Sequence, residues 1–181
     1  MPEGLGEYLL VTSNEETGGE YVEMEWTMPP GAFAPPAHRH PTQVEEYEVL
    51  EGDFEVMVGG RWRTLGPGDS ASVPVNTDHT FRTIPGQTVR VRNFHRPGGR
   101  FDEFIEEQHR FVASKRFRGL KRPSTAIAMA MAWHEHADLL VPSSRPCAGR
   151  SRSSLVLAGC LATRLGRTSD LPRRHRAIAI A

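Results

Sequence analysis

The chain has 181 residues, of which 38% are hydrophobic and 24% charged, which is enough for one domain with a buried core. Its 22 basic and 22 acidic residues balance, yet residues 1–114 hold 9 Arg and 19 Asp or Glu, and the remainder holds 13 Lys or Arg and 3 Asp or Glu. An acidic first part without basic clusters argues against nucleic acid as the main partner.

The cysteines and the N-terminal stretch give no indication of a secreted or membrane protein. Cys147 and Cys160 belong to no CxxC pair, so a disulfide framework is not expected. The stretch MPEGLGEYLLVTSNEE is acidic and has no long apolar run, so we expect neither a signal peptide nor a membrane span. A cytoplasmic protein without a membrane partner is therefore the expectation.

Residues 7–95 have the pattern of antiparallel β structure, with short alternations of apolar and polar residues separated by Gly, Pro, Asn and Asp. Gly59 and Gly60 stand where a two-residue hairpin needs positive φ angles, and Gly66 to Asp69 predict a tight reversal. This many short strands predicts a barrel or a sandwich. The candidate strands are 7–12, 20–28, 37–40, 45–52, 53–59, 61–65, 70–75, 79–84 and 88–95.

Polar residues occupy inward positions of this pattern. His38 and His40 are two apart, so a strand points both imidazoles to the same face. Glu45 shares its parity with Tyr47 and Val49, which places a carboxylate on an otherwise apolar face. A buried carboxylate is costly unless a cation lies beside it. These positions therefore indicate a single cation site.

His79 completes a candidate ligand set, because it shares parity with Phe81 and Thr83 on a later strand. Three imidazoles and one carboxylate suit Fe(II), Mn(II), Zn(II), Ni(II) or Cu(II), and the ligand types do not choose among these ions. In a six-coordinate site such a set leaves two positions open.

Two stretches resemble the cupin motifs. Residues 31–52 resemble the first motif through Gly31, His38, His40, Glu45 and Gly52, with one extra residue between Gly31 and His38. Residues 68–83 resemble the second motif, with Asn76 in place of the usual glycine and Thr83 in place of the usual asparagine, and with Gly68, Pro74 and His79 matching. Asn tolerates the left-handed backbone, so the turn at Asn76 should survive. The resemblance covers roughly residues 25–95.

The resemblance to small single-domain, quercetin-dioxygenase-like cupins of the cupin_2 type implies a mainly β fold: one antiparallel double-stranded β-helix, or jelly roll. It also implies that His38, His40, Glu45 and His79 bind a divalent first-row metal ion. A small organic molecule would bind beside the ion, and Phe54, Val56, Phe81 and Val91 would form an apolar pocket wall. The family also makes a homodimer plausible.

The reaction is left open by the sequence. A metal-dependent dioxygenase-type oxidoreductase is the favoured activity, and the alternatives are a non-catalytic binding or regulatory cupin and a metal-dependent isomerase or lyase. The absence of an obvious additional acid or base near the motifs favours the non-catalytic alternative. No catalytic residue is assigned.

After residue 98 the sequence pattern changes from the alternation typical of strands to helical spacing. Helical spacing predicts helices over 99–117 and 123–140, the second with a Ser/Thr cap, followed by an Arg- and Ser-rich tail. We therefore divide the chain into a cupin β-barrel over 1–98, a helical extension over 99–142 and a basic tail over 143–181. The tail is left without assigned structure, and disorder or a shifted reading frame after about Pro146 would each account for its composition.

Several polar residues near the motifs have simpler interpretations. Glu45 alone would pair with an arginine such as Arg39 or Arg82. His95 is interpreted as a structural histidine, with contact to the site as the alternative, and Tyr47 as an aromatic wall residue. A second HxH pair, together with one further histidine, is expected to be solvated on helices, because helical residues two apart point about 200° apart. These are His134, His136 and His109.

Overall fold

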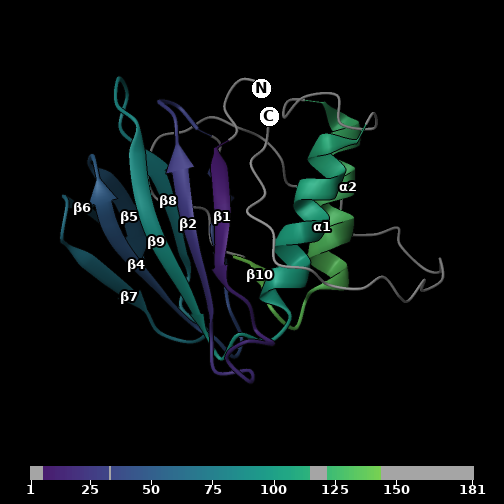
Figure 1. Ribbon diagram of the computed structural model, residues 1–181. Helices are drawn as coiled ribbons and strands as arrows, with labels where there is room; N and C mark the ends of the chain where they lie inside the picture. The colour runs from purple at the N-terminus through teal and green to yellow at the C-terminus, as the bar shows by residue number, and fades with distance from the viewer. Residues whose placement is uncertain (1–5, 33, 115–121, 144–181) are drawn as a thin grey trace.

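The computed structural model describes residues 6–32, 34–114 and 122–143, and these form two antiparallel sheets and a pair of helices (Figure 1). One sheet has the strand order β1-β2-β9-β4-β7 and the other β10-β3-β8-β5-β6. This arrangement confirms the predicted cupin-type jelly roll followed by helices. The strands are β1 Glu7–Thr12, β2 Val22–Met28, β3 His38–Arg39, β4 Val44–Glu51, β5 Phe54–Val58, β6 Arg61–Leu65, β7 Ser70–Val73, β8 His79–Thr83, β9 Val89–Arg96 and β10 Val141–Pro142.

The turns between the strands follow the predicted backbone chemistry. Gly59 and Gly60 both have positive φ, +58° and +86°, and join β5 to β6. Asn76 also has positive φ, +58°, in the turn before β8, and its N–H donates to the carbonyl of His40 over 2.7 Å. That bond ties the loop before His79 to the end of β3.

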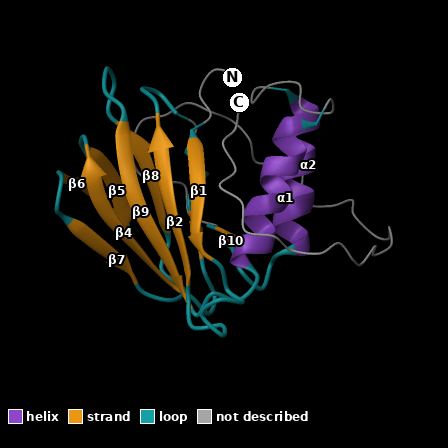
Figure 2. Cartoon of the chain, viewed as in Figure 1, coloured by secondary structure: helices purple, strands orange, loops and turns teal. Residues whose placement is uncertain are grey.

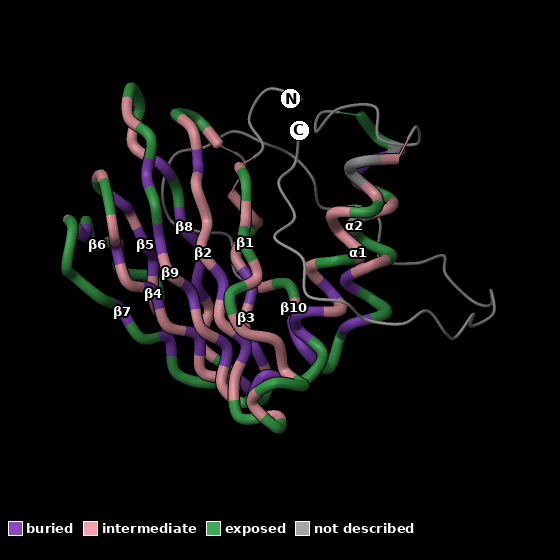
Figure 3. Tube along the Cα trace, in the orientation of Figure 1, coloured by how far each residue is buried: buried purple, intermediate pink, exposed green. Residues whose placement is uncertain are grey.

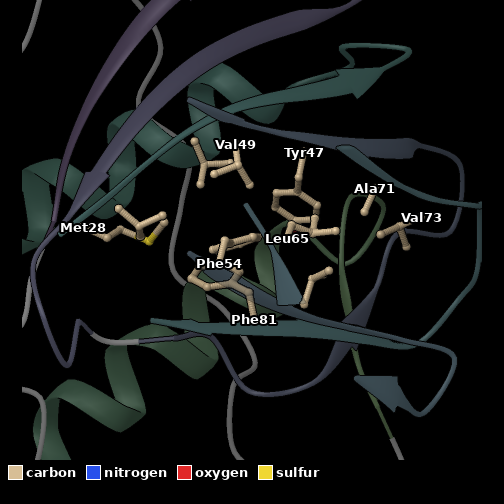
Figure 4. Close-up of a cluster of buried hydrophobic side chains, with 11 residues drawn as sticks. Met28, Tyr47, Val49, Phe54, Leu65, Ala71, Val73 and Phe81 are labelled. Carbon is tan, nitrogen blue, oxygen red and sulfur yellow. The ribbon is translucent and has the colours of Figure 1, made fainter. Parts of the chain in front are cut away.

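The core between the sheets is built from the predicted inward-facing side chains. Its buried members include Val91. Tyr47, Phe54 and Phe81 of the same cluster lie between the sheets (Figure 4). The same alternation appears along β4 and β9 as buried and less buried residues in turn (Figure 3). Since the interior of this part is apolar, the polar groups that enter it require an explanation of their own.

Two helices, α1 Phe101–Ala113 and α2 Pro123–Glu135, lie beside the strands near β1 and β10 (Figure 2). A second apolar cluster joins them to the sheet, with Phe101, Phe104 and Trp133 packed against Met24 of β2. The predicted Ser/Thr cap of α2 is wrong: Arg122 occupies the cap position without a side-chain cap bond, and Pro123 begins the helix. Proline is favoured there because the first helical N–H needs no partner within the helix.

The chain returns to the sheet after α2. Val141 and Pro142 of β10 pair with Arg39 and His38 of β3, so residues about 100 positions apart become neighbours. The division of the chain into 1–98, 99–142 and 143–181 stays a prediction, and the predicted tail from residue 144 onward lies outside the described residues. None of the described helices has the length and apolar character needed to cross a membrane.

Candidate metal centre

His38, His40, Glu45 and His79 meet at one point inside the fold. One ligand atom from each lies within 4.8 Å of the others, and the four residues are 6%, 2%, 4% and 0% exposed. Their convergence follows from the topology: His38 of β3 pairs directly with His79 of β8, and Glu45 enters from β4 of the facing sheet. The four residues predicted from the sequence are thus brought together.

Each of the three imidazoles is held through its Nδ1 atom by a backbone carbonyl. The Nδ1 to oxygen distances are 3.0 Å from His38 to Pro36, 2.6 Å from His40 to Leu139 and 2.9 Å from His79 to Thr77. A carbonyl only accepts, so these bonds assign the proton to Nδ1 and leave Nε2 of a neutral ring as a lone pair. Such anchoring is typical of metal-ligating histidines.

The Nε2 atoms of His79 and His40 both approach one carboxylate oxygen. Oε2 of Glu45 lies 2.6 Å from Nε2 of His79 and 3.4 Å from Nε2 of His40. All three atoms are buried and make no hydrogen bond within the described part of the chain. Lone pairs at these distances repel one another unless a cation lies among them, either a proton or a metal ion. The donor set therefore fits a divalent first-row metal.

The protonation of this group follows from the same contacts. Burial raises the pKa of Glu45, but the positive charge of His79 outweighs burial and holds that pKa well below its usual range. Burial lowers the pKa of His79, but the Glu45 carboxylate outweighs burial and raises it above the usual value. Burial lowers the pKa of His38 to about 3, so that ring is neutral. Without a metal, a proton on His79 supplies the positive charge.

Three polar side chains beside Glu45 lie closer to the site than the sequence pattern indicated. His95 is 0% exposed and its Nε2 lies 3.4 Å from Oε1 of Glu45, while burial lowers its pKa to about 4. Asn93 donates from Nδ2 to the same oxygen over 3.0 Å. Tyr47 is buried, and burial followed by the Glu45 charge raises its pKa well above the usual range. Their shared inward parity was the available signal. The expected lack of acid or base groups near the motifs is therefore wrong.

Residues of the helical extension cover the centre. The Trp133 ring lies 5.6 Å from the His38 ring, centroid to centroid, and Phe101 lies 5.8 Å from His40. Phe101 also stacks on His95 with ring centroids 3.4 Å apart. Because the Leu139 carbonyl accepts from His40, the extension both covers and orients the site.

The structure shows which residues pair with the arginines considered as partners of Glu45 and how exposed the histidines of the second HxH pair are. The two arginines considered for Glu45 contact other carboxylates, Arg39 with Asp78 and Arg82 with Glu55. His134 is exposed as expected, but the expectation for His136 is wrong. Its side chain is buried between the helices, with Nε2 2.8 Å from Oε2 of Glu107. The packing of α2 against α1, which no local pattern encodes, causes this burial.

The residues expected to form an apolar pocket wall are packed instead. They are 0–3% exposed and belong to the closed core between the sheets: Phe54, Val56, Phe81 and Val91. A cavity of about 300 Å³ lies elsewhere, on the side of β4 and β7 that Glu46, Glu48, Ser70 and Ser72 line. Near the candidate centre, the described structure instead shows contacts with Trp133, Phe101 and Leu139 of the extension.

Known proteins resemble the strand-rich part of the chain. Residues 24–92 match the family described as "Cupin domain". A solved structure from Thermus thermophilus is 22% identical at a TM-score of 0.48, covering 53% of this chain and 87% of that one. DMSP lyase DddQ from Ruegeria pomeroyi DSS-3 is 30% identical at a TM-score of 0.39, covering 43% and 39%. A predicted oxalate decarboxylase from Thermotoga maritima is 17% identical at a TM-score of 0.48, covering 51% and 80%. No curated protein matches the chain.

Proposed function

We propose that this chain, whose residues 24–92 match the cupin domain family, binds one divalent first-row metal ion and holds a small organic molecule beside it. The ligands are His38, His40, Glu45 and His79. The observation that carries the proposal is the convergence of these side chains. Each imidazole is anchored at Nδ1, and the Nε2 atoms of His40 and His79 lie beside Oε2 of Glu45. The described fold provides no other charge partner for Glu45 outside this cluster of imidazoles.

The chain's own residues prepare the site for a ligand. A bound ion would act as a Lewis acid toward a substrate oxygen or, for iron and manganese, give access to dioxygen. The imidazoles and Glu45 fill four positions and leave the others to exchangeable ligands. Phe101 and Trp133 keep bulk water from the rings that they cover, so charges at the site interact through a medium of low polarity.

A dioxygenase-type oxidoreductase is the favoured activity, because a redox metal needs little help from proton-transferring side chains. The second candidate, a metal-dependent isomerase or lyase, gains support from His95 and Tyr47, which place an imidazole and a phenol beside Glu45. A non-catalytic small-molecule-binding protein is the remaining alternative. The fold alone does not choose among these activities.

The first test is the metal content of the purified protein and of two ligand variants, His40→Ala and Glu45→Ala. We expect about one equivalent of metal in the wild type, as four ligands predict, and its loss in both variants. His134→Ala is the matched control, because it removes an exposed histidine from the second HxH pair. Elemental analysis after metal loading and gel filtration gives the measurement.

The outcome also directs the search for the reaction. Iron, manganese, nickel or copper would favour oxygen-uptake assays with small phenolic compounds, whereas zinc would favour isomerase or lyase assays. A wild type that takes up no metal after loading, or ligand variants that retain it, would contradict the proposed site.

A further inference from the structure

Two polar side chains of β9 face the candidate centre without belonging to its ligand set. Asn93 and His95 are 1% and 0% exposed, and neither position requires a polar group for the sheet to form. The pairing of β4 with β9 places His95 directly opposite Glu45, and Asn93 opposite Tyr47. Burying an amide and an imidazole costs free energy unless their hydrogen bonds are made inside the protein.

The contacts of Asn93 fix the orientation of its amide. Its Nδ2 donates to Oε1 of Glu45 over 3.0 Å and to the carbonyl of Glu46 over 3.2 Å. Its Oδ1 lies 3.0 Å from Nε2 of His95, so this imidazole donates from Nε2. His95 thereby holds the amide in place, and Phe101, stacked on the ring, holds His95.

The two oxygens of Glu45 consequently have different surroundings. Oε1 lies within hydrogen-bond distance of Asn93, with His95 3.4 Å away, whereas Oε2 faces His79 and His40. A donor on one oxygen hinders that oxygen from turning toward the ion. A carboxylate held in this way presents a single oxygen to the metal.

We propose that Asn93, supported by His95, positions Glu45 as a ligand through Oε2 alone and so keeps one coordination position free for a substrate oxygen. The inference rests on the proposed metal site. Asn93 and His95 are positioning residues, because they act through Glu45 and reach the ion by no contact of their own.

The test is Co²⁺ binding by the full chain and by Asn93→Leu, a variant of similar shape that cannot donate to Oε1. We expect the affinity to fall by roughly 10- to 100-fold, the usual effect of losing an outer hydrogen bond to a ligand. We also expect the visible absorption of bound Co²⁺ to change, because the freed Oε1 can join Oε2 on the ion and raise the coordination number. Purely structural damage to the fold would not produce a defined new spectrum.

Two further variants keep the experiment decisive. Thr83→Val is the control, since Thr83 is a 9% exposed interior residue whose hydroxyl has no hydrogen bond in the described structure, and it should match the wild type. His95→Phe keeps a ring against Phe101 but removes the support of Asn93, so it should show a smaller spectral change in the same direction. It also provides the readout if Asn93→Leu does not fold.

The outcomes separate the two proposals. A wild-type affinity and spectrum in both β9 variants would overturn the positioning role while leaving the metal site intact. A wild type that binds no Co²⁺ would overturn the metal site itself, and the positioning role with it. Weaker binding and a changed spectrum in Asn93→Leu, beside an unchanged Thr83→Val, would support the inference.

Discussion

Gly31 and Gly52, the two glycines of the first motif, share a left-handed backbone but differ in their surroundings. Their φ angles are +70° and +73°. A Cβ atom on Gly31 would meet nothing within 4 Å, whereas one on Gly52 would lie 2.5 Å from the carbonyl oxygen of Thr88. Position 31 therefore requires glycine only for its backbone conformation. Position 52 requires glycine for its backbone conformation and because the Thr88 carbonyl, directly before β9, lies close to it.

This difference predicts unequal effects of the same substitution. Gly31→Ala should lower the free energy of unfolding by about 1 to 2 kcal/mol, the cost of the left-handed region. Gly52→Ala should cost more, by about 1 to 3 kcal/mol in addition, because the backbone must move to relieve the contact. Urea denaturation of both variants measures the difference, and equal losses would show that the Thr88 contact is relieved without cost.

At the same scale, the four candidate ligands could be predicted from the sequence, but the residues that position them could not. His38, His40, Glu45 and His79 follow from residue parity and motif spacing, both of which are local properties of the sequence. The bond from Asn93 to Glu45 depends on the register of β4 against β9, which strands 48 residues apart establish only when folded. A local pattern gives the direction of a side chain but not its partner.

Among the elements, α2 does more for the site than its sequence indicated. Trp133 packs on the His38 ring, while Ile127 and Met131 of the same helix are 54% and 52% exposed. The hydrogen bond between His136 and Glu107 fixes the end of α2 against α1, and Leu139 follows one turn later with its carbonyl on His40. The helix is thus placed to limit exchange at the centre.

Removing the Trp133 ring tests that role. We expect Trp133→Ala to lower the free energy of unfolding by about 3 kcal/mol, as for other large buried aromatic residues. We also expect it to release bound metal to a chelator faster than the wild type, because the cover over His38 is gone. Met131→Ala on the exposed side of the helix is the control. Equal release rates in the two variants, measured by stopped-flow chelation, would show that α2 does not limit access.

The strands and helices differ in how clearly the local sequence pattern indicates them. The strands from β1 to β9 were predicted within about two residues at each end, because alternation and Gly or Asn turns mark them locally. Helical spacing predicted where both helices begin, but α2 ends at Glu135 and not at residue 140 as predicted. β10 was not predicted, since Val141 and Pro142 show no alternation and become a strand only by pairing with β3. Tertiary contact decides such short elements.

At the scale of the whole molecule, two buried neutral imidazoles make the free energy of unfolding depend on pH. Burial lowers the pKa of His38 to about 3 and that of His95 to about 4, whereas an unfolded histidine titrates near 6.5. Between these values the unfolded chain binds more protons than the folded chain. The free energy of unfolding of the metal-free protein must then fall as the pH falls below about 6.5.

Two further residues of the centre, His79 and Glu45, act outside this window. The pKa of folded His79 is raised, so its contribution is complete below about 6.5 and is lost only as the pH rises through the folded value. The pKa of folded Glu45 is lowered, so its contribution is complete above about 4.5 and is lost as the pH falls through the folded value. Between about pH 4.5 and 6.5 neither residue opposes the effect of His38 and His95.

We therefore expect the metal-free protein to lose about 2 to 3 kcal/mol of unfolding free energy between pH 6 and pH 5, since each group contributes up to about 1.4 kcal/mol per pH unit. Urea denaturation in the presence of a chelator measures this slope. His95→Phe should reduce it to about half, because one of the two titrating groups is gone. His134→Ala should keep it, since that histidine is exposed in the fold. An unchanged slope in His95→Phe would mean that His95 is protonated inside the folded protein, which its buried position beside Phe101 opposes.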